Sequence, residues 1–154
     1  MNYWLLKSEP ETFSIDALQK CSKATHCWDG VRNYQARNYM RDAMQVGDQA
    51  FFYHSSCKIP GISGIVEIVS EKYPDHTAFD PESKYYDPKA TADNPRWFMR
   101  DVRLIKKFKN IITISQLRAS KDLVEMFILR PGNRLSITPV TEQQWRKILE
   151  LEKI

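Results

Sequence analysis

The densest group of residues suited to nucleic-acid binding is the segment WDGVRNYQARN between Trp28 and Asn38. It combines one indole ring, a glycine, two arginines and three side-chain amides within eleven residues. Aromatic faces stack on bases, amides hydrogen-bond to base edges, and arginines bind phosphates. The same pattern fits an amphipathic helix in which Trp28 is a core residue and Asn33 only caps the helix. The residue types alone leave both interpretations open.

A basic run later in the chain has the composition of a polyanion-binding surface. Between residues 96 and 109, six cations face the single acid Asp101. Such a charge distribution positions a nucleic-acid backbone, although an exposed strand edge protected by lysines has the same composition. The six cations are Arg96, Arg100, Arg103, Lys106, Lys107 and Lys109.

Catalytic chemistry is an alternative use of two other residues. Lys7 and Glu67 both fall in predicted strands, and a buried lysine beside a carboxylate would suit general acid/base catalysis. A structural ion pair is the competing interpretation of the same two residues. His54 and Ser55 are adjacent on a predicted strand, where neighbouring side chains point to opposite faces, so they do not form a nucleophile and its base.

The sequence predicts no metal and no cofactor. The cysteines and histidines that could bind zinc have none of the usual ligand spacings. They are Cys21, His26, Cys27, His54 and Cys57. With five glycines the chain also lacks a phosphate-binding loop pattern, which excludes typical nucleotide kinases and dehydrogenases.

Composition indicates one globular domain over residues 1–154. The chain has a mass of 18.1 kDa, 42% hydrophobic residues and a net charge of +4. A mean hydropathy of -0.52 and short apolar runs exclude a membrane-spanning segment of about 20 apolar residues. The first ten residues lack the features of a signal peptide, so we expect a cytoplasmic protein, with the nucleoid as an alternative location. We expect a monomer.

Periodicity predicts helices and strands in an α+β arrangement. Ser14 precedes Ile15, Leu18 and Cys21 at helical spacing, and residues 33–44 form an amphipathic pattern. Residues 22–31 show no sustained period. Strands are predicted at residues 2–7, 49–55, 62–69, 97–108 and 134–140, with the second and third paired.

The remaining segments are a long loop and short helices. Four prolines between Pro74 and Pro95 predict an irregular loop of the kind that is often functional. Helical turns are predicted at 115–117 and 122–129, and Thr141 with Gln144 forms a capping box for a C-terminal helix. Because alternating βαβ units are missing, we expect a small, mostly antiparallel curled sheet or barrel packed by helices.

Several motifs in this order resemble the EVE domain family over essentially the whole chain. The resemblance implies a PUA-like fold, a curled mixed β-barrel of five to six strands with flanking helices, related to the YTH domain. It also implies a reader of modified bases, with modified cytosine in DNA as the usual ligand and RNA as an alternative polymer. The motifs are YWLLKSEP at 3–10, WDGVRNYQARNYMR at 28–41, the strand from Gly47 to Ser55, GIVE at 64–67, and the segment from Asp80 to Pro88 with its YYDP.

The resemblance also assigns residues to a base pocket and to backbone binding. Trp28 would form one aromatic wall, and the second wall stays open among Tyr85, Tyr86 and Trp97. The pocket residues implied are Lys7, Ser8, Trp28, Gly30, Val31, Arg32, Asn33, Ser55, Tyr85 and Asp87. Backbone binding is expected from Arg37 and Arg41 together with Arg96, Arg100, Arg103, Lys106 and Lys107. In the alternative of a PUA-like hydrolase of modified nucleosides, Lys7 and Glu67 would act as acid and base.

Overall fold

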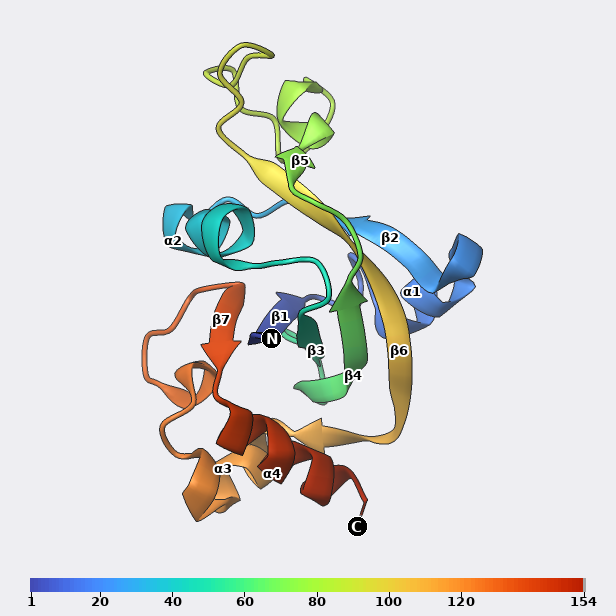
Figure 1. Cartoon of the computed structure of the whole chain (residues 1–154), viewed down its shortest axis with the longest axis vertical. Helices are drawn as coiled ribbons and strands as arrows, with labels where there is room; N and C mark the ends of the chain where they lie inside the picture. Colours follow the sequence, from blue (N-terminus) through green and yellow to red (C-terminus); the bar gives the residue numbers. More distant parts are fainter. Residues whose placement is uncertain (154) are drawn as a thin grey trace.

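The aromatic and β-branched runs form the strands of one curled mixed sheet in a computed structural model that describes residues 1–153 (Figure 1). The strand order is β2-β6-β4-β3-β1-β7, and β5 pairs with β6 beside this path. β1 and β3 are parallel, whereas every other pairing is antiparallel. The strands are β1 (Tyr3–Ser8), β2 (Thr25–Trp28), β3 (Gln49–His54), β4 (Gly61–Ile68), β5 (Tyr73–Pro74), β6 (Phe98–Thr113) and β7 (Ile137–Val140).

The predicted fold class is confirmed, and the sheet is open. Within residues 1–153 the two outer strands, β2 and β7, do not pair with each other. Register shifts between β3 and β4 and between β4 and β6 mark irregularities that allow the sheet to curl. The structure therefore has the predicted curled mixed sheet with flanking helices rather than a closed barrel.

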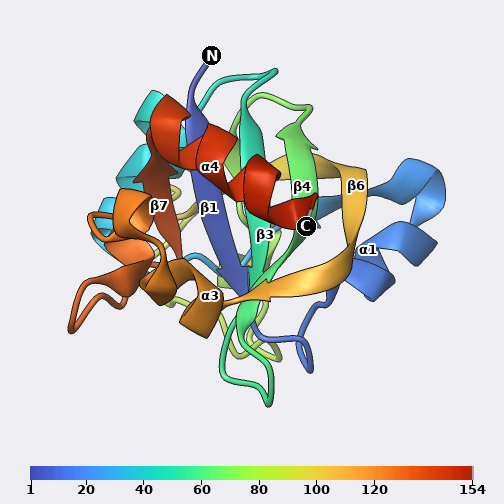
Figure 2. The same cartoon turned by 90° about the horizontal axis from the view of Figure 1, so that it is seen from below.

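Alternation along the central strands builds a hydrophobic core on each face of the sheet. Leu6 and Phe52 pack with Met40 on one face, whereas Leu5 and Phe51 pack with Trp145 on the other. Figure 1 shows α2 on the first side of the sheet, and Figure 2 shows α4 lying across β1, β3 and β4 on the second. The helices are α1 (Ile15–Lys20), α2 (Tyr34–Asn38), α3 (Ile114–Ala119) and α4 (Glu142–Glu152).

Side-chain caps begin the helices where the sequence predicts them. The Ser14 hydroxyl accepts a hydrogen bond from the Ala17 amide at 3.0 Å, and Thr141 with Gln144 forms the reciprocal capping box. Asn33 caps α2, which continues as a π-helical turn over Tyr39–Ala43 and so covers the predicted amphipathic segment. None of the described helices is long and apolar enough to cross a membrane.

Two elements that border the site were not predicted. β2 lies in the segment 22–31 that shows no period, and its pairing with β6 supplies the order that its own sequence does not indicate. Within the proline-rich loop, His76–Phe79 forms a 3₁₀ turn whose N-cap is Asp75. These two elements border a cavity that both Trp28 and Tyr85 line.

Candidate functional site

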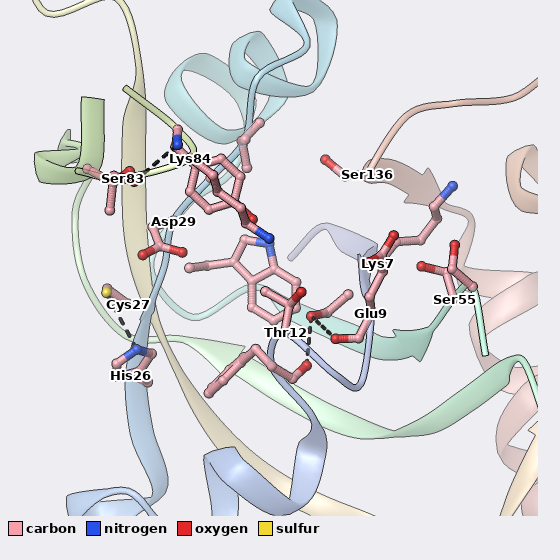
Figure 3. Close-up of a pocket in the computed structure, with 18 residues that line it drawn as sticks. Lys7, Glu9, Thr12, His26, Cys27, Asp29, Ser55, Ser83, Lys84 and Ser136 are labelled. Carbon is pink, nitrogen blue, oxygen red and sulfur yellow. Dashed lines mark hydrogen bonds between the residues drawn. The ribbon is translucent and has the colours of Figure 1, made fainter. Parts of the chain in front are cut away.

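A cavity of about 690 Å³ opens beside the ends of β1 and β3, next to β2 and the segment 77–85. In Figure 3, Lys7, Ser55 and Ser136 lie on one side of it, and Asp29 and Lys84 lie on the other. Small-molecule sites typically enclose about 300–1,000 Å³. The cavity therefore has the size of a site for a ligand such as a nucleotide.

Most of the predicted pocket residues line this cavity. Strands β1 and β2, the loop after β2, the end of β3 and the 77–85 segment each contribute at least one of them. The predicted residues that line it are Lys7, Ser8, Trp28, Gly30, Val31, Ser55 and Tyr85.

Trp28 is at once a core residue and a wall of the cavity. Only 5% of the residue is exposed, and Phe13 and Phe52 contact its ring edge-to-face, at centroid distances of 6.2 and 5.2 Å. Such perpendicular contacts hold the indole in one orientation. The ring therefore belongs to the core, as one of the two interpretations predicts, and it also borders the cavity, so its stacking on a base stays a prediction.

Tyr85 adds a further aromatic ring to the cavity lining, beside Trp28 and Phe13, and its position depends on Gly30. Gly30 has a φ of +77°, and a Cβ at this residue would lie 2.5 to 2.9 Å from three carbons of the Tyr85 ring. The other two residues considered for this wall lie elsewhere: Tyr86 is exposed, and Trp97 is buried with its indole N–H donated to Asp87 at 2.7 Å.

One buried carboxylate connects the two sides of the pocket. Asp75 accepts hydrogen bonds from the Gly30 amide at 2.8 Å and from Arg32 Nη1 at 3.0 Å, through the same oxygen Oδ2. Arg32 in turn donates through Nε and Nη2 to the backbone oxygen of Tyr85, at 3.0 and 2.8 Å. Asp75 and Arg32 therefore fix the loop after β2 against the segment that carries Tyr85.

The electrostatics of this connection favour the ionised carboxylate. Burial alone would raise the pKa of Asp75, but hydrogen bonds from Thr77, Gly30 and Arg32 hold it below its usual value. The side chain of Asp75 is fully buried, so its charge depends on these donors.

The titratable groups inside the pocket are shifted by burial. Desolvation raises the pKa of Asp29, with a further contribution from the nearby charge of Asp75, and lowers the pKa of Lys7. Burial, with Asp29 and other acids, raises the pKa of the Cys27 thiol to about 11. Cys27 is therefore a neutral thiol at neutral pH and not an activated nucleophile.

Three predicted pocket residues lie outside the cavity lining and support it from behind. Arg32 donates to Asp75 and to the backbone oxygen of Tyr85, as described above. Asn33 is exposed and, as the cap of α2, accepts hydrogen bonds from the Gln35 and Ala36 amides. Asp87 accepts from the Trp97 indole and lies 3.6 Å from Arg96. The polar groups of these three residues make hydrogen bonds or ion pairs within the protein.

The prediction that Arg100 binds a nucleic-acid backbone is wrong. Only 3% of this residue is exposed, and its guanidinium donates to the backbone oxygens of Met40, Met44 and Ser70. Arg100 thus holds the end of the helical segment after α2 against β6.

The other cations of the basic run separate along β6 instead of forming one patch. Arg103 pairs with Glu67 at 3.1 Å, Lys106 pairs with Glu152 of α4 at 3.0 Å, and Lys107 pairs with Asp16 of α1. The strand is 16 residues long, and the acidic partners of these three cations belong to three different elements, β4, α4 and α1. By contrast, Arg37, Arg41 and Arg96 gather around α2, where Arg37 donates to the Arg96 carbonyl oxygen at 3.1 Å.

The predicted Lys7–Glu67 acid/base pair is also wrong. Lys7 lies opposite Tyr53 of β3, whereas Glu67 lies opposite Gln49 of the same strand. Four residues of a strand separate these positions by roughly 13 Å. Glu67 instead accepts a hydrogen bond from Arg103.

Some lining residues were not predicted from the sequence. Phe13, Asp29 and Lys84 border the cavity, and Lys84 Nζ lies 5.0 Å from the centroid of the Tyr85 ring. Asp29 directly follows Trp28 in the same motif, and this position was the available signal. Within residues 1–153 no group of three or more His, Cys, Asp or Glu side chains has the arrangement of a metal site.

Comparison with known proteins assigns the chain to a family. The model of the EVE domain matches residues 2–151. The chain belongs to the EVE domain family. This EVE domain is 44% identical to human thymocyte nuclear protein 1 over 99% of the chain and 74% of that protein. It is 38% identical to an uncharacterized protein of Schizosaccharomyces pombe over 98% of the chain and 68% of that protein.

Solved structures of relatives have the same fold as this EVE domain. A protein from Pseudomonas putida superposes with a TM-score of 0.93 at 50% identity, over 97% of this chain and 99% of the other. Human THYN1 in complex with 5-methylcytosine-containing DNA superposes with a TM-score of 0.94 at 44% identity, over 100% and 99%. The YTH domain of Mmi1 shares the fold, with a TM-score of 0.57 at 14% identity over 99% and 88%.

Proposed function

We propose that this EVE domain is a non-enzymatic reader that holds one modified base, foremost a modified cytosine in DNA, in the cavity between Trp28 and Tyr85. The observation that carries the proposal is the cavity itself, which is lined by the aromatic rings of Trp28, Tyr85 and Phe13 together with several polar side chains. The crystal structure of human THYN1 with 5-methylcytosine-containing DNA supports this choice of ligand. The separation of Lys7 from Glu67 removes the acid/base pair on which the hydrolase alternative depended.

The chemistry of the pocket fits a base that carries an exocyclic amino group. Asp29 lines the cavity, and its carboxyl can accept a hydrogen bond from the exocyclic amino group of a cytosine, which thymine lacks. Phe13, Val31 and Trp28 provide apolar surface for a methyl group. Burying one methyl contributes about 0.8 kcal/mol, roughly a fourfold gain in affinity, so the amino group and ring stacking carry most of the selectivity.

The base has to leave its stack before it enters the cavity. Extrusion from a duplex costs a few kcal/mol, so we expect unpaired or mismatched positions to bind better than paired ones. Lys7 and Lys84 border the cavity and carry amines suited to flanking phosphates. Binding should therefore weaken as salt concentration rises.

Fluorescence anisotropy with labelled single-stranded oligonucleotides that differ only at one central base tests the proposal. We expect 5-methylcytosine to bind more tightly than thymine. Tyr85→Ala should weaken this binding about 5- to 150-fold, the effect of losing one stacked base. The matched control is Tyr86→Ala, because Tyr86 is the exposed neighbour outside the cavity lining and its loss should leave the affinity unchanged.

Equal losses in the two variants, or equal affinity for all central bases, would exclude a base-specific site in this cavity. The same titration with RNA decides the polymer: tighter binding of the RNA oligonucleotide would replace DNA by RNA in the proposal. Thermal unfolding of each variant shows whether a loss of affinity reflects a loss of fold.

A further inference from the structure

A series of planar groups connects the pocket wall to an exposed aromatic ring at the start of α2. The Arg32 guanidinium carbon lies 5.3 Å from the centroid of the Tyr85 ring and 5.2 Å from the centroid of Trp97. Trp97 is stacked with Tyr34, with centroids 4.9 Å apart and an interplanar angle of 24°. Tyr34 is therefore three short steps from the cavity, on the side of the molecule where α2 lies (Figure 1).

Tyr34 is exposed although it stacks on a buried ring. The residue is 47% exposed, whereas Trp97 beneath it is 6% exposed. An aromatic side chain in this position covers apolar surface with one face and presents the other to solvent. Tyr34 does so beside the pocket, and none of the pocket contacts described above uses it.

The outer face of the Tyr34 ring is not covered by its arginine neighbour. The Arg37 guanidinium carbon lies 4.7 Å from the Tyr34 ring centroid and 5.8 Å from that of Trp97. A group on the face of Tyr34 opposite Trp97 would lie much farther from Trp97. Its distance would be about the Trp97–Tyr34 centroid distance plus its own distance from the Tyr34 ring. Arg37 therefore lies against the ring on the side toward Trp97, within cation–π distance of Tyr34.

A second arginine, Arg96, lies near the hydroxyl end of the ring, with its guanidinium carbon 5.8 Å from the Tyr34 ring centroid. Arg96 donates a hydrogen bond to the Tyr34 hydroxyl and lies 3.6 Å from Asp87, which partly balances its charge. Arg37 donates to the carbonyl oxygen of Arg96 and to the side-chain oxygen of Asn38, which are neutral acceptors. A half-exposed aromatic ring with two guanidiniums close to it combines base stacking with phosphate attraction.

We propose that Tyr34, with Arg37 and Arg96, is a second nucleotide-binding site that stacks a base of the same strand as the base held in the pocket. This inference rests on the proposed function, because the pocket fixes the strand that reaches Tyr34. Nucleotides stacked along one strand advance about 3.4 Å each, so a few of them cover the distance from Tyr85 to Tyr34. Since Tyr34 lies on one side of the cavity, it binds nucleotides that extend in only one direction from the modified base.

The test compares 5-methyl-2′-deoxycytidine monophosphate with oligothymidylates that carry one 5-methylcytosine at either the 5′ or the 3′ end. Tyr34→Ala should leave the affinity for the monophosphate unchanged and weaken one of the two oligonucleotides about 5- to 150-fold. Tyr34→Phe keeps the ring and should retain the affinity, whereas Tyr34→Leu keeps only an apolar side chain and should lose it. Tyr86→Ala again serves as the control for an exposed tyrosine.

Three outcomes would overturn the site. The first is an unchanged affinity of Tyr34→Ala for both oligonucleotides. The second is an equal loss for the monophosphate and the oligonucleotides, which would place Tyr34 behind the pocket wall as a structural support. The third is full affinity of Tyr34→Leu. Failure of the proposed function looks different, because Tyr85→Ala would then bind the monophosphate as tightly as the unsubstituted protein does.

Discussion

Replacing Asp75 with Asn should unfold the protein at a markedly lower urea concentration. Asp75 is fully buried and accepts from the Gly30 amide, the Arg32 guanidinium, and the amide and hydroxyl of Thr77. Asparagine has one acceptor oxygen, so the two donors that face its NH₂ group lose their acceptor. A hydrogen bond to a charged group contributes about 1.5–3 kcal/mol, and breaking a buried ion pair costs about 3–5 kcal/mol, so we expect a loss of about 3–5 kcal/mol.

Urea denaturation followed by tryptophan fluorescence measures this loss. With a slope of about 1–3 kcal/mol per molar urea, the midpoint should fall by about 1–5 M. Asp42→Asn is the matched control, since Asp42 is an exposed partner of Arg41 and its substitution should leave the midpoint unchanged. An unchanged midpoint for Asp75→Asn would refute the argument that this carboxylate fastens the pocket.

The pH dependence of stability provides a second measure of the same group. The pKa of Asp75 is lower in the folded state than in the unfolded chain. At a pH between these two pKa values, the unfolded chain therefore binds more protons than the folded protein does. The stabilisation is therefore present above about pH 4 and is lost as the pH falls through the folded-state pKa. Asp75→Asn should remove this part of the acid-induced loss, and an identical pH profile would contradict it.

Three further substitutions test other parts of the structure. Gly30→Ala should displace the Tyr85 ring and weaken base binding at least tenfold in the anisotropy assay, because the new methyl meets that ring and the φ of +77° is strained; unchanged binding would contradict this placement. Burial lowers the pKa of His54, whose Nε2 accepts the Ile15 amide at 3.2 Å, so stability measured by urea denaturation should fall as the pH drops below about 6.5; His54→Gln should flatten this dependence, and an unaltered slope would refute it. A variant with Cys27 as its single cysteine should react with iodoacetamide at a rate that still rises near about pH 10, whereas a plateau near pH 8.5 would mean that the thiol is not buried as described.

Local sequence signals predicted most of the fold. The cap at Ser14 and the capping box at Thr141 place two helices at their observed starts, because a cap is a short-range hydrogen bond. β2 was missed because its four residues have little pattern of their own and are ordered by pairing with β6. Elements whose stability comes from a distant partner carry little signal in their own sequence.

The incorrect site predictions have identifiable physical causes. Arg100 was grouped with the basic run although it shares a strand face with Val102 and Leu104, so alternation along the strand already indicated an inward side chain. The Lys7–Glu67 pair depended on the register of three strands, which composition does not specify. The role of Asp75 could not be predicted either. The sequence does not distinguish a buried aspartate that accepts hydrogen bonds from two segments from the other aspartates of an acidic loop.

The central claim is that a modified base lies against Trp28 and Tyr85, and NMR on the complex with a 5-methylcytosine oligonucleotide tests it most directly. Nuclear Overhauser contacts should connect the 5-methyl protons of the base to ring protons of Trp28 or Tyr85 and to Val31. Methyl contacts confined to residues outside the cavity, such as those along β6, would contradict the account.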